Sequence, residues 1–402
     1  MTKRLYYDDA YGLEFTARVV DVTASEEGRS SVVLDATLFY PTSGGQMHDT
    51  GTLGGLPVVD VVDEATRIVH VVEGDAPDPG AEVTGSIDGL RRAHHRQQHT
   101  GQHVLSRVIE DGWGWPTLSS RLGESMNTLE IEAAEVPRQM MREMEDRTNQ
   151  LLWKGHAVRV RYLEEDEAAE AGLRKKVERE GPVRVVEVDG VDRCACGGTH
   201  VASTAEIGLV AIVGAEKMRK GTRLLFVCGE RAQQWRRDRV DWLDETARQL
   251  TTGMDLVPET VARLQDESKA RKKRMESMAR DLVEARVPRW RDQSEQVGGY
   301  RATLRILDAD EALAASEGIH AVVADADIVA GFVVEDGAKC QVMMAASEGI
   351  AIDCGKLLST ALSPLGGRGG GQASFARGGC QGVPARDVIA SIRDALGSDA
   401  DD

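Results

Sequence analysis

The sequence is poor in aromatic residues, which make up only 4% of its 402 residues, so aliphatic side chains and methionine must fill its cores. It has no run of about 18 apolar residues, which argues against a membrane-spanning helix. Its opening residues contain no apolar stretch that would predict a signal peptide. Its six cysteines are too few and too scattered for a disulfide-stapled secreted domain. We therefore expect a cytoplasmic protein with no membrane partner.

Basic residues are also in deficit. Lysine and arginine number 49 against 66 acidic residues, which gives a formal net charge of −17. Because nucleic-acid phosphates are bound by lysine and arginine, this balance argues against a nucleic-acid-binding surface spread over the whole protein. A local basic surface remains compatible with the acidic total.

The length predicts two to four domains, at roughly 100–200 residues each. The patterns along the chain indicate an α+β multidomain protein. Short Val- and Thr-rich runs between Gly, Asp and Pro turns predict a small β-barrel-like domain at residues 1–87. Mixed helix and strand patterns predict an α/β domain at residues 88–228 and another at residues 297–402. Residues 229–296, between them, are expected to form a helical hairpin or coiled-coil arm.

Individual elements follow from the hydrophobic period. Helices are expected where apolar residues recur at helical spacing, and strands in short β-branched runs. The expected helices span residues 91–110, 137–153, 354–362 and 385–396. The expected strands span residues 15–22, 31–34, 56–62, 68–72, 158–162, 183–188, 209–213, 223–227, 302–307, 320–324, 329–334 and 341–346, and a glycine-rich loop is expected at 366–382.

The arm is predicted from a four-three spacing of apolar residues in its second helix. Gly253 and Pro258 mark the turn before this helix. Two amphipathic helices lying on a globular core are the alternative. The basic run from Lys269 to Arg274 either contacts phosphates or forms a solvated helix face. The expected seam comprises Val257, Val261, Leu264, Ser268, Arg271, Met275, Met278, Leu282 and Ala285.

Two pairs of potential metal ligands share a four-residue spacing. His99 and His103 lie in the expected helix at 91–110, where this spacing points both rings to one face. Cys196 and His200 form the second pair, at the ends of a Cys-Gly-Gly-Thr-His run. Three imidazoles and one thiolate suit zinc by ligand type and by number. We therefore expect one zinc ion per chain.

Two neighbouring residues are alternative ligands. His95 lies four residues before His99 and shares its helical face. Cys194 lies two residues before Cys196 and points the same way if the segment is extended. Ordinary packing is the competing interpretation for both. A fully coordinated shell would be structural, whereas an open one would admit substrate or water, and the spacing alone is compatible with either.

Three motifs follow one another along the chain. The first resembles the N-terminal glycine-rich motif of the alanyl-tRNA synthetase editing domain, the second its zinc motifs, and the third the Gly-rich stretch of the C-terminal domain. With a helical arm between and no aminoacylation domain expected, the chain resembles the free-standing editing proteins called AlaX, in their long form. The motifs are Phe39-Tyr40-Pro41-Thr42-Ser43-Gly44-Gly45-Gln46 with Asp49-Thr50-Gly51, His99-Thr100-Gly101-Gln102-His103 with the Cys196–His200 run, and Gly366-Gly367-Arg368-Gly369-Gly370-Gly371.

The resemblance implies a zinc-dependent trans-editing hydrolase that deacylates mischarged Ser-tRNA(Ala), with Gly-tRNA(Ala) as a candidate second substrate. Editing of this kind has a physical reason. Serine is alanine plus one hydroxyl, and an apolar pocket cannot strongly reject an isostere that only adds a hydroxyl. The expected partners are tRNA(Ala) carrying serine or glycine, and a second copy of the chain bound through the C-terminal half.

The resemblance also assigns roles to particular residues. Thr37 matches a threonine that helps to recognise the serine hydroxyl, and Gln46 is expected to place the ester carbonyl or the amino group. A strand threonine and a turn residue are the competing interpretations. The expected site comprises Thr37, Gln46 and Cys196 for catalysis, Thr37, Gly44, Gly45, Gln46 and Arg368 for substrate binding, and His99, His103, Cys196 and His200 for the metal.

Two other functions fit parts of the pattern. In a non-catalytic tRNA-binding or assembly module the zinc would be structural, but Thr37 and Gln46 beside intact zinc pairs favour the enzyme. A phosphodiesterase would carry an Asp-His-His motif. Here Ala93 precedes His94 and His95, and aspartate-rich metal strands are missing.

Overall fold

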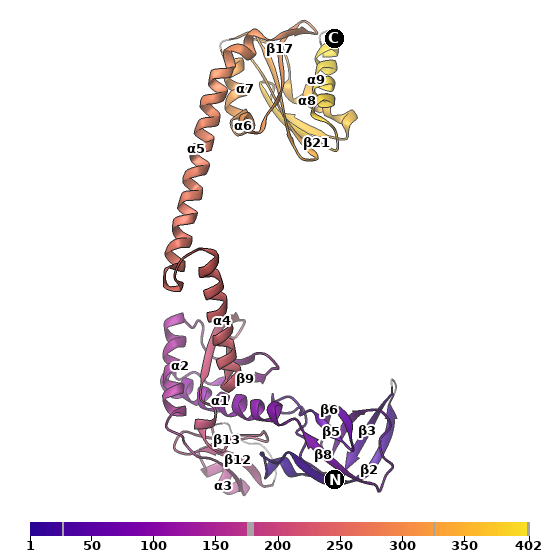
Figure 1. Ribbon diagram of the computed structural model, residues 1–402, viewed down its shortest axis with the longest axis vertical. Helices are drawn as coiled ribbons and strands as arrows, with labels where there is room; N and C mark the ends of the chain where they lie inside the picture. Colours follow the sequence, from indigo (N-terminus) through magenta and orange to yellow (C-terminus); the bar gives the residue numbers. More distant parts are fainter. Residues whose placement is uncertain (26–27, 175–180, 325, 400–402) are drawn as a thin grey trace. The chain divides into compact units, whose positions relative to one another are not determined.

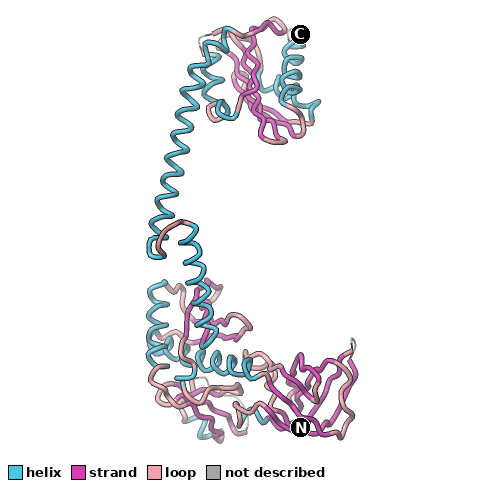
Figure 2. Tube along the Cα trace, in the orientation of Figure 1, coloured by secondary structure: helices cyan, strands magenta, loops and turns pink. Residues whose placement is uncertain are grey.

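The computed structural model describes residues 1–402 apart from 26–27, 175–180, 325 and 400–402 (Figure 1). The chain divides into two compact units, residues 1–245 and 246–402. Each unit contains both helices and sheets (Figure 2), which confirms the expected multidomain protein of mixed α and β structure. No helix in the described part of the chain joins the length and the apolar character that a membrane crossing requires. The finer division into four domains stays a prediction.

The first unit begins with a closed barrel of six strands in the order β2-β3-β7-β6-β5-β8. Strand β8 pairs back with β2, which closes the ring. Buried aliphatic side chains such as Leu34 and Ile68 fill its interior, as expected of a small barrel. The strands are β2 (Glu14–Ser25), β3 (Arg29–Leu34), β5 (Gly51–Leu53), β6 (Leu56–Glu64), β7 (Arg67–Glu73) and β8 (Glu82–Ile87), and β1 (Lys3–Arg4), followed by the 3-10 helix η1 (Leu5–Tyr7), pairs with β4 (Ala36–Thr37).

Helix α1 (Gly89–Trp113) leads from the barrel into the rest of the first unit. Its first turn is capped by Asp88, whose side chain accepts from the Arg91 N–H at 3.0 Å. Its apolar face packs in one core cluster with Leu129 and Phe226 of a four-stranded sheet. The helix expected at 91–110 is therefore confirmed, and it is longer by a few residues at each end.

Two small sheets complete the first unit, with strand orders β14-β15-β10-β9 and β11-β12-β13. Strands β9 and β10 are additional to the expected elements, because polar residues such as Ser119 and Ser120 interrupt their apolar alternation. The elements are β9 (Thr117–Leu122), β10 (Asn127–Ile131), α2 (Arg138–Leu152), β11 (Val158–Leu163), α3 (Glu165–Glu170), β12 (Val183–Val188), β13 (Asp192–Ala195), η2 (Thr204–Glu206), β14 (Val210–Met218), β15 (Gly221–Cys228) and α4 (Gly229–Gln249).

The second unit has a six-stranded sheet in the order β16-β17-β18-β19-β21-β20, in which only β17 and β18 pair in parallel. Helices α8 and α9 cover one face, and α7 with the end of α5 covers the other (Figure 1). The elements are η3 (Met254–Leu256), α5 (Val257–Asp292), β16 (Glu295–Val297), β17 (Tyr300–Leu307), α6 (Ala309–Ala312), α7 (Ala315–Val323), β18 (Val329–Asp336), β19 (Lys339–Ala346), α8 (Cys354–Leu362), η4 (Ser363–Leu365), β20 (Arg368–Gly371), β21 (Phe375–Gln381) and α9 (Ala385–Asp399).

Two expected elements of the second unit were wrong. Residues 320–324 were expected as a strand but lie in and directly after α7, because a short apolar run suits a buried helix as well as a strand. The expected glycine-rich loop contains the β20–β21 hairpin at the sheet edge. A Cβ on Gly369 would lie 2.8 Å from the Leu358 side chain, so the glycine permits close packing of β20 on α8.

The buried face of α5 also differs from the expected seam. Val283, Val287 and Trp290 pack into a core cluster of the second unit. Met278 of the expected seam is 62% exposed, and Ala285 is exposed as well. Burial at every third or fourth residue is typical of an amphipathic helix on a globular core, and here it runs over residues 279–290. Val261, Leu264 and Met275, earlier in the helix, are exposed. The expected hairpin of two helices stays a prediction.

Candidate metal centre

Four residues of the first unit converge on one point. His99 and His103 lie on one face of α1, and Cys196 and His200 come from the segment that follows β13. Their ligand atoms all lie within 4.8 Å of one another. The two four-residue spacings thus bring all four predicted ligands together, and this group can hold a metal ion.

The atoms that face inward are one sulfur and the imidazole Nε2 atoms. Cys196 Sγ lies 3.3 Å from Nε2 of His99 and 3.3 Å from Nε2 of His200. This approach depends on Gly198, because a Cβ at that residue would lie 2.1 Å from Cε1 of the His99 ring. Gly198 is therefore required, because the backbone of the Cys-Gly-Gly-Thr-His run packs directly against the His99 ring.

Each imidazole also has an oxygen on its outer side. Outer partners of this kind fix the ring orientation and the tautomer of metal-binding histidines. In all three cases the histidine atom concerned is Nδ1, which leaves Nε2 for the metal. The contacts are Gln46 Oε1 to His99 at 2.8 Å, Thr100 Oγ1 to His200 at 3.1 Å, and Asp192 Oδ2 to His103 at 3.3 Å.

The contacts of Gln46 define its orientation and the proton position on His99. Gln46 Oε1 also accepts from the backbone N–H of Thr199 at 3.2 Å, and Gln46 Nε2 donates to Thr199 Oγ1 at 3.0 Å. Because a backbone N–H only donates, Oε1 is an acceptor and Nδ1 of His99 carries the proton. Nε2 of His99 therefore keeps its lone pair toward Cys196, which is the state that metal binding requires.

The environment shifts the pKa values of the ligands. Burial opposes ionisation of Cys196, but the imidazoles of His99 and His200 outweigh it and hold the pKa of the thiol well below its usual value. Burial lowers the pKa of His200 to about 3. For His103 burial is again the largest influence, but Asp192 and Cys196 overcome it and raise the pKa to about 9. The environment thus favours a Cys196 thiolate beside a neutral His200, whereas His103 is protonated near pH 7 and must release its Nε2 proton when a metal binds.

The two alternative ligands lie outside the cluster. His95 faces the glycine-rich motif instead, with its Nδ1 3.8 Å from Oδ1 of Asp49. The Sγ of Cys194 lies 3.6 Å from the carbonyl oxygen of Ala195. Within the described ranges, the group that could hold a metal ion consists of the four predicted residues.

The glycine-rich motif forms a tight turn whose last residue is Gln46. Ser43 and Gln46 exchange backbone hydrogen bonds of 3.0 and 2.9 Å, and Gly44 and Gly45 between them have φ values of 55° and 85°. This left-handed backbone favours glycine. The carbonyl of Gly45 accepts from the Leu122 N–H at 2.8 Å, which fixes the turn against β9. The glycines thus place Gln46, and their contact with a substrate stays a prediction.

Thr37 is completely buried in the first unit. Its Oγ1 lies 2.8 Å from Nε2 of His70 and accepts from the Phe39 N–H at 3.0 Å. Nδ1 of His70 lies 3.1 Å from the carbonyl oxygen of Val32, so Nδ1 carries the proton and Nε2 accepts from the Thr37 hydroxyl. Burial lowers the pKa of His70 to about 4, which keeps the ring neutral near pH 7. Thr37 therefore has one unused lone pair, and its contact with a substrate stays a prediction.

A buried ion pair joins the glycine-rich motif to the helix that carries two ligands. Arg92 Nη2 lies 2.6 Å from Asp49 Oδ2, and both side chains are fully buried. Arg92 also donates to the carbonyl oxygen of Leu38, and Asp49 accepts from the Tyr40 N–H at 2.7 Å. The pair therefore fixes the segment between Thr37 and Gln46 against α1.

Sequence reasoning missed several residues that support the centre. Asp192 is held by Arg174, whose Nε lies 3.2 Å from Oδ1. Arg184 donates to the carbonyl oxygens of Cys196 and of Tyr7, which anchors the chain at the thiolate. These contacts join residues far apart in the chain, so no local spacing could have revealed them.

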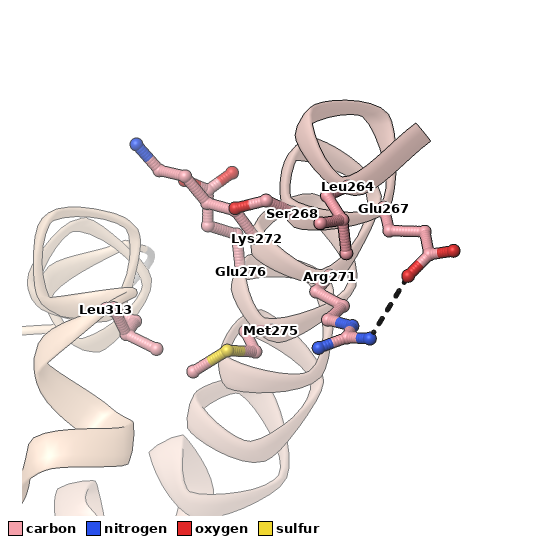
Figure 3. Close-up of a pocket in the computed structure, with 8 residues that line it drawn as sticks. All are labelled: Leu264, Glu267, Ser268, Arg271, Lys272, Met275, Glu276 and Leu313. Carbon is pink, nitrogen blue, oxygen red and sulfur yellow. Dashed lines mark hydrogen bonds and ion pairs between the residues drawn. The ribbon is translucent and has the colours of Figure 1, made fainter. Parts of the chain in front are cut away.

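Arg368 and the basic run of α5 belong to the second unit. Arg368 begins β20 and is exposed. In the run, Arg271 pairs with Glu267 at 3.3 Å and Lys269 with Asp266 at 3.5 Å, so part of its charge is neutralised within the helix. A cavity of about 300 Å³ lies between this helix and Leu313. Figure 3 shows its lining residues, and none of the four candidate metal ligands is among them.

Comparison with known proteins identifies the family. The family model described as Threonyl and Alanyl tRNA synthetase second additional domain matches residues 183–225, which include Cys196 and His200. The alanyl-tRNA editing protein Aarsd1 of Danio rerio is 31% identical over 290 residues, 68% of this chain and 70% of that protein. The chain belongs to the alanyl-tRNA editing protein family.

Other relatives differ in how much of their own length this chain covers. The alanyl-tRNA editing protein AlaX-L of Pyrococcus horikoshii is 29% identical over 400 residues, 96% of this chain and 96% of that protein. The alanine–tRNA ligase of Methanopyrus kandleri is 32% identical over 393 residues, 94% of this chain but 42% of the ligase. The chain thus spans less than half the length of the ligases it matches. The resemblance to long-form AlaX drawn from the motifs is confirmed.

Proposed function

We propose that this member of the family is a zinc-dependent trans-editing hydrolase that deacylates Ser-tRNA(Ala), with Gly-tRNA(Ala) as a second substrate. The observation that carries the proposal is the cluster of three imidazoles and one thiolate, in which every imidazole has an outer oxygen partner. The relatives named as alanyl-tRNA editing proteins support the substrate class.

Zinc is the metal that the donor set favours. Four ligands of imidazole and thiolate type suit a tetrahedral zinc ion. The Sγ–Nε2 separations of 3.3 Å are close to the roughly 3.5 Å between sulfur and nitrogen ligands at standard zinc bond lengths. A bound zinc ion supplies Lewis acidity, which polarises an ester carbonyl or lowers the pKa of a water molecule.

The residues of the chain hold the ligands and select the amino acid. Gln46 fixes the ring of His99 and the backbone of Thr199, and it is proposed to act through this centre. Thr37 is proposed to accept a hydrogen bond from the serine hydroxyl, because its own hydrogen is donated to His70. Alanine lacks that donor, so only serine gains the contact.

The second unit is proposed to add affinity for the tRNA outside the acceptor end. Arg368 lies exposed at the edge strand β20 and offers a planar guanidinium for a phosphate. A second copy of the chain is proposed to bind through this C-terminal half. Both proposals follow from the resemblance to the C-terminal domain of alanyl-tRNA synthetases.

A non-catalytic tRNA-binding module with a structural metal is the second candidate. The observation in its favour is that the protein itself offers four ligands, and a closed four-ligand shell is typical of structural zinc. The two functions differ in one measurable respect, because only the hydrolase releases an amino acid.

Release of amino acid from preformed aminoacyl-tRNA tests the proposal. Ser-tRNA(Ala) and Ala-tRNA(Ala) are incubated separately with the full chain, and free serine and alanine are followed over time. Serine is expected to be released much faster than alanine and faster than in buffer. Binding of both tRNAs without release of either amino acid would support the module instead.

A further inference from the structure

A basic groove lies on the first unit, away from the metal ligands. It has a volume of about 360 Å³ and is bordered by α2, β14 and α4. Its apolar part includes Met141, Ile212 and Trp235, and its rim carries Arg138, Arg142 and Arg236. None of the residues assigned to the metal centre or to substrate binding lines it.

The walls of the groove are fixed to one another. Asn149 of α2 donates to the carbonyl oxygen of Val210 at 2.9 Å and accepts from its N–H at 2.8 Å, which anchors α2 to β14. Glu145 accepts from the Ile212 N–H at 2.7 Å and pairs with Arg236 of α4. Helix α2 is therefore fixed to β14, and an ion pair joins it to α4 across the groove.

The charge of the groove is compensated only in part, because Glu145 lines it together with three arginines. Arg138 and Arg142 stand one helical turn apart, which places them on one face of α2. Both are exposed, and neither has an acidic partner in the described part of the chain. Arg236 is the exception, because it pairs with Glu145.

The turn between β14 and β15 extends this basic surface. Arg219 and Lys220 of the turn are exposed, as is Lys217 near the end of β14. Thr222 donates to the carbonyl oxygen of Ala133 at 2.8 Å, which places the turn against the segment that leads into α2. On a chain of net charge −17 these exposed cations form a local basic surface that can attract an anionic partner.

We propose that this groove binds the sugar-phosphate backbone of the tRNA. The inference rests on the proposed function for the identity of the polyanion. The guanidinium groups of Arg138 and Arg142 match phosphate oxygens in geometry and charge. Met141, Ile212 and the half-buried Trp235 give a ribose an apolar surface. One face of the Trp235 ring already carries the Arg239 guanidinium, which lies 4.2 Å from the ring centroid. Contacts with phosphate and ribose fix the position of the tRNA without reading its sequence.

A salt titration of tRNA binding tests the groove. The variant Arg138→Gln/Arg142→Gln is compared with the parent and with Arg18→Gln/Arg29→Gln, all as full-length zinc-loaded protein. Arg18 and Arg29 are exposed on barrel strands, so the control removes the same charge from another surface. Each lost phosphate contact lowers the slope of log K against log salt by about 1. We therefore expect a slope smaller by about 1–2 and an affinity lower by roughly tenfold for the groove variant only.

Additional variants and measurements distinguish loss of tRNA contacts from loss of folding. The thermal unfolding temperatures of both variants should match the parent, because the four arginines are exposed. The pair Lys217→Gln/Arg219→Gln should reduce the slope further when combined with the groove variant. If the groove variant, the control and the parent have equal tRNA affinity and equal salt slope, the inference is wrong. An acidic protein would then be the partner that fits the groove. Serine release by the parent is measured in parallel, so a failure of the proposed function is seen separately.

Discussion

Gln46 Oε1 lies 2.8 Å from Nδ1 of His99 and also accepts from the backbone N–H of Thr199. The side-chain amide of Gln46, at the end of the glycine-rich turn, thus fixes both His99 on α1 and the Cys196–His200 run. The turn itself is fixed by the positive φ values of Gly44 and Gly45. The barrel part of the chain therefore contributes to the metal centre without supplying a ligand.

Replacing Gln46 should weaken metal binding. Gln46→Ala removes the outer partner of His99, and loss of such a partner typically lowers metal affinity about 10–100-fold. Competition with a chromophoric chelator measures the affinity for zinc. Gln139→Ala, at an exposed position of α2, is the control and should bind as the parent does. Equal zinc affinity in the parent and Gln46→Ala would show that Gln46 does not position His99.

Thr37 variants separate recognition of serine from packing in the barrel. Thr37→Val removes the acceptor for the serine hydroxyl and should reduce selectivity for Ser-tRNA over Ala-tRNA by about 1–3 kcal/mol. It also leaves Nε2 of His70 without its donor, which should destabilise the fold by a similar amount. Thr37→Ser keeps both hydrogen bonds and is the control. An unchanged ratio of serine to alanine release in Thr37→Val would make Thr37 a structural residue alone.

The buried pair of Arg92 and Asp49 should make stability depend on pH. Burial is the largest influence on the pKa of Asp49 and would raise it, but His95, Arg92 and the Tyr40 N–H together hold the pKa below its usual value. A depressed pKa in the folded state stabilises the fold at pH values above the unfolded pKa, and this contribution is lost as pH falls through the folded pKa.

Asp49→Asn leaves the Arg92 charge buried and unpaired, and should destabilise the protein by about 3–5 kcal/mol at pH 7. Urea unfolding at pH 7 and at about pH 3 measures the difference, which should shrink in acid. Asp21→Asn, which removes an exposed pair with Arg67, should change stability by about 0–1 kcal/mol. A penalty for Asp49→Asn as small as that of Asp21→Asn would contradict the assigned role of the buried pair.

Removal of the second unit should separate chemistry from tRNA affinity. A cut after Cys228 would take away α4, whose fully buried Ala232 packs with Ala211 and Val227. A fragment of residues 1–245 keeps this cluster and all four ligands. We expect it to prefer Ser-tRNA(Ala) as the full chain does, with weaker tRNA affinity and a shallower salt dependence. Equal affinity and slope for the two would assign the second unit to oligomerisation or stability.

The convergence of the four candidate ligands could be predicted because each pair depends on a local spacing. His99 and His103 lie four residues apart on a helix with clear apolar periodicity, and Cys196 and His200 repeat that spacing. The outer partners could not be predicted in this way. Asp192 reaches His103 only through the packing of β13 near α1, and no pattern in the sequence encodes that contact.

The errors in the predicted fold have similar causes. Residues 320–324 are apolar enough to form a strand. They lie in and directly after helix α7 because this segment packs on the face of the sheet. Glycines in 366–382 argued against a strand, but Gly369 lies where α8 leaves no room for a side chain. Tertiary packing overrode local propensity in both places.

The coupling of metal content to serine release tests the proposed hydrolase most directly. Zinc per chain is measured together with the rates of serine release from Ser-tRNA(Ala) and alanine release from Ala-tRNA(Ala). The protein is assayed as purified, after removal of the metal, and after zinc is restored, with Cys196→Ala in parallel. We expect one zinc per chain, release of serine far faster than alanine, loss of activity with the metal, and recovery on adding zinc to the parent but not to Cys196→Ala. Serine release that persists in metal-free protein, or equal release of serine and alanine, would contradict a zinc-dependent editing hydrolase.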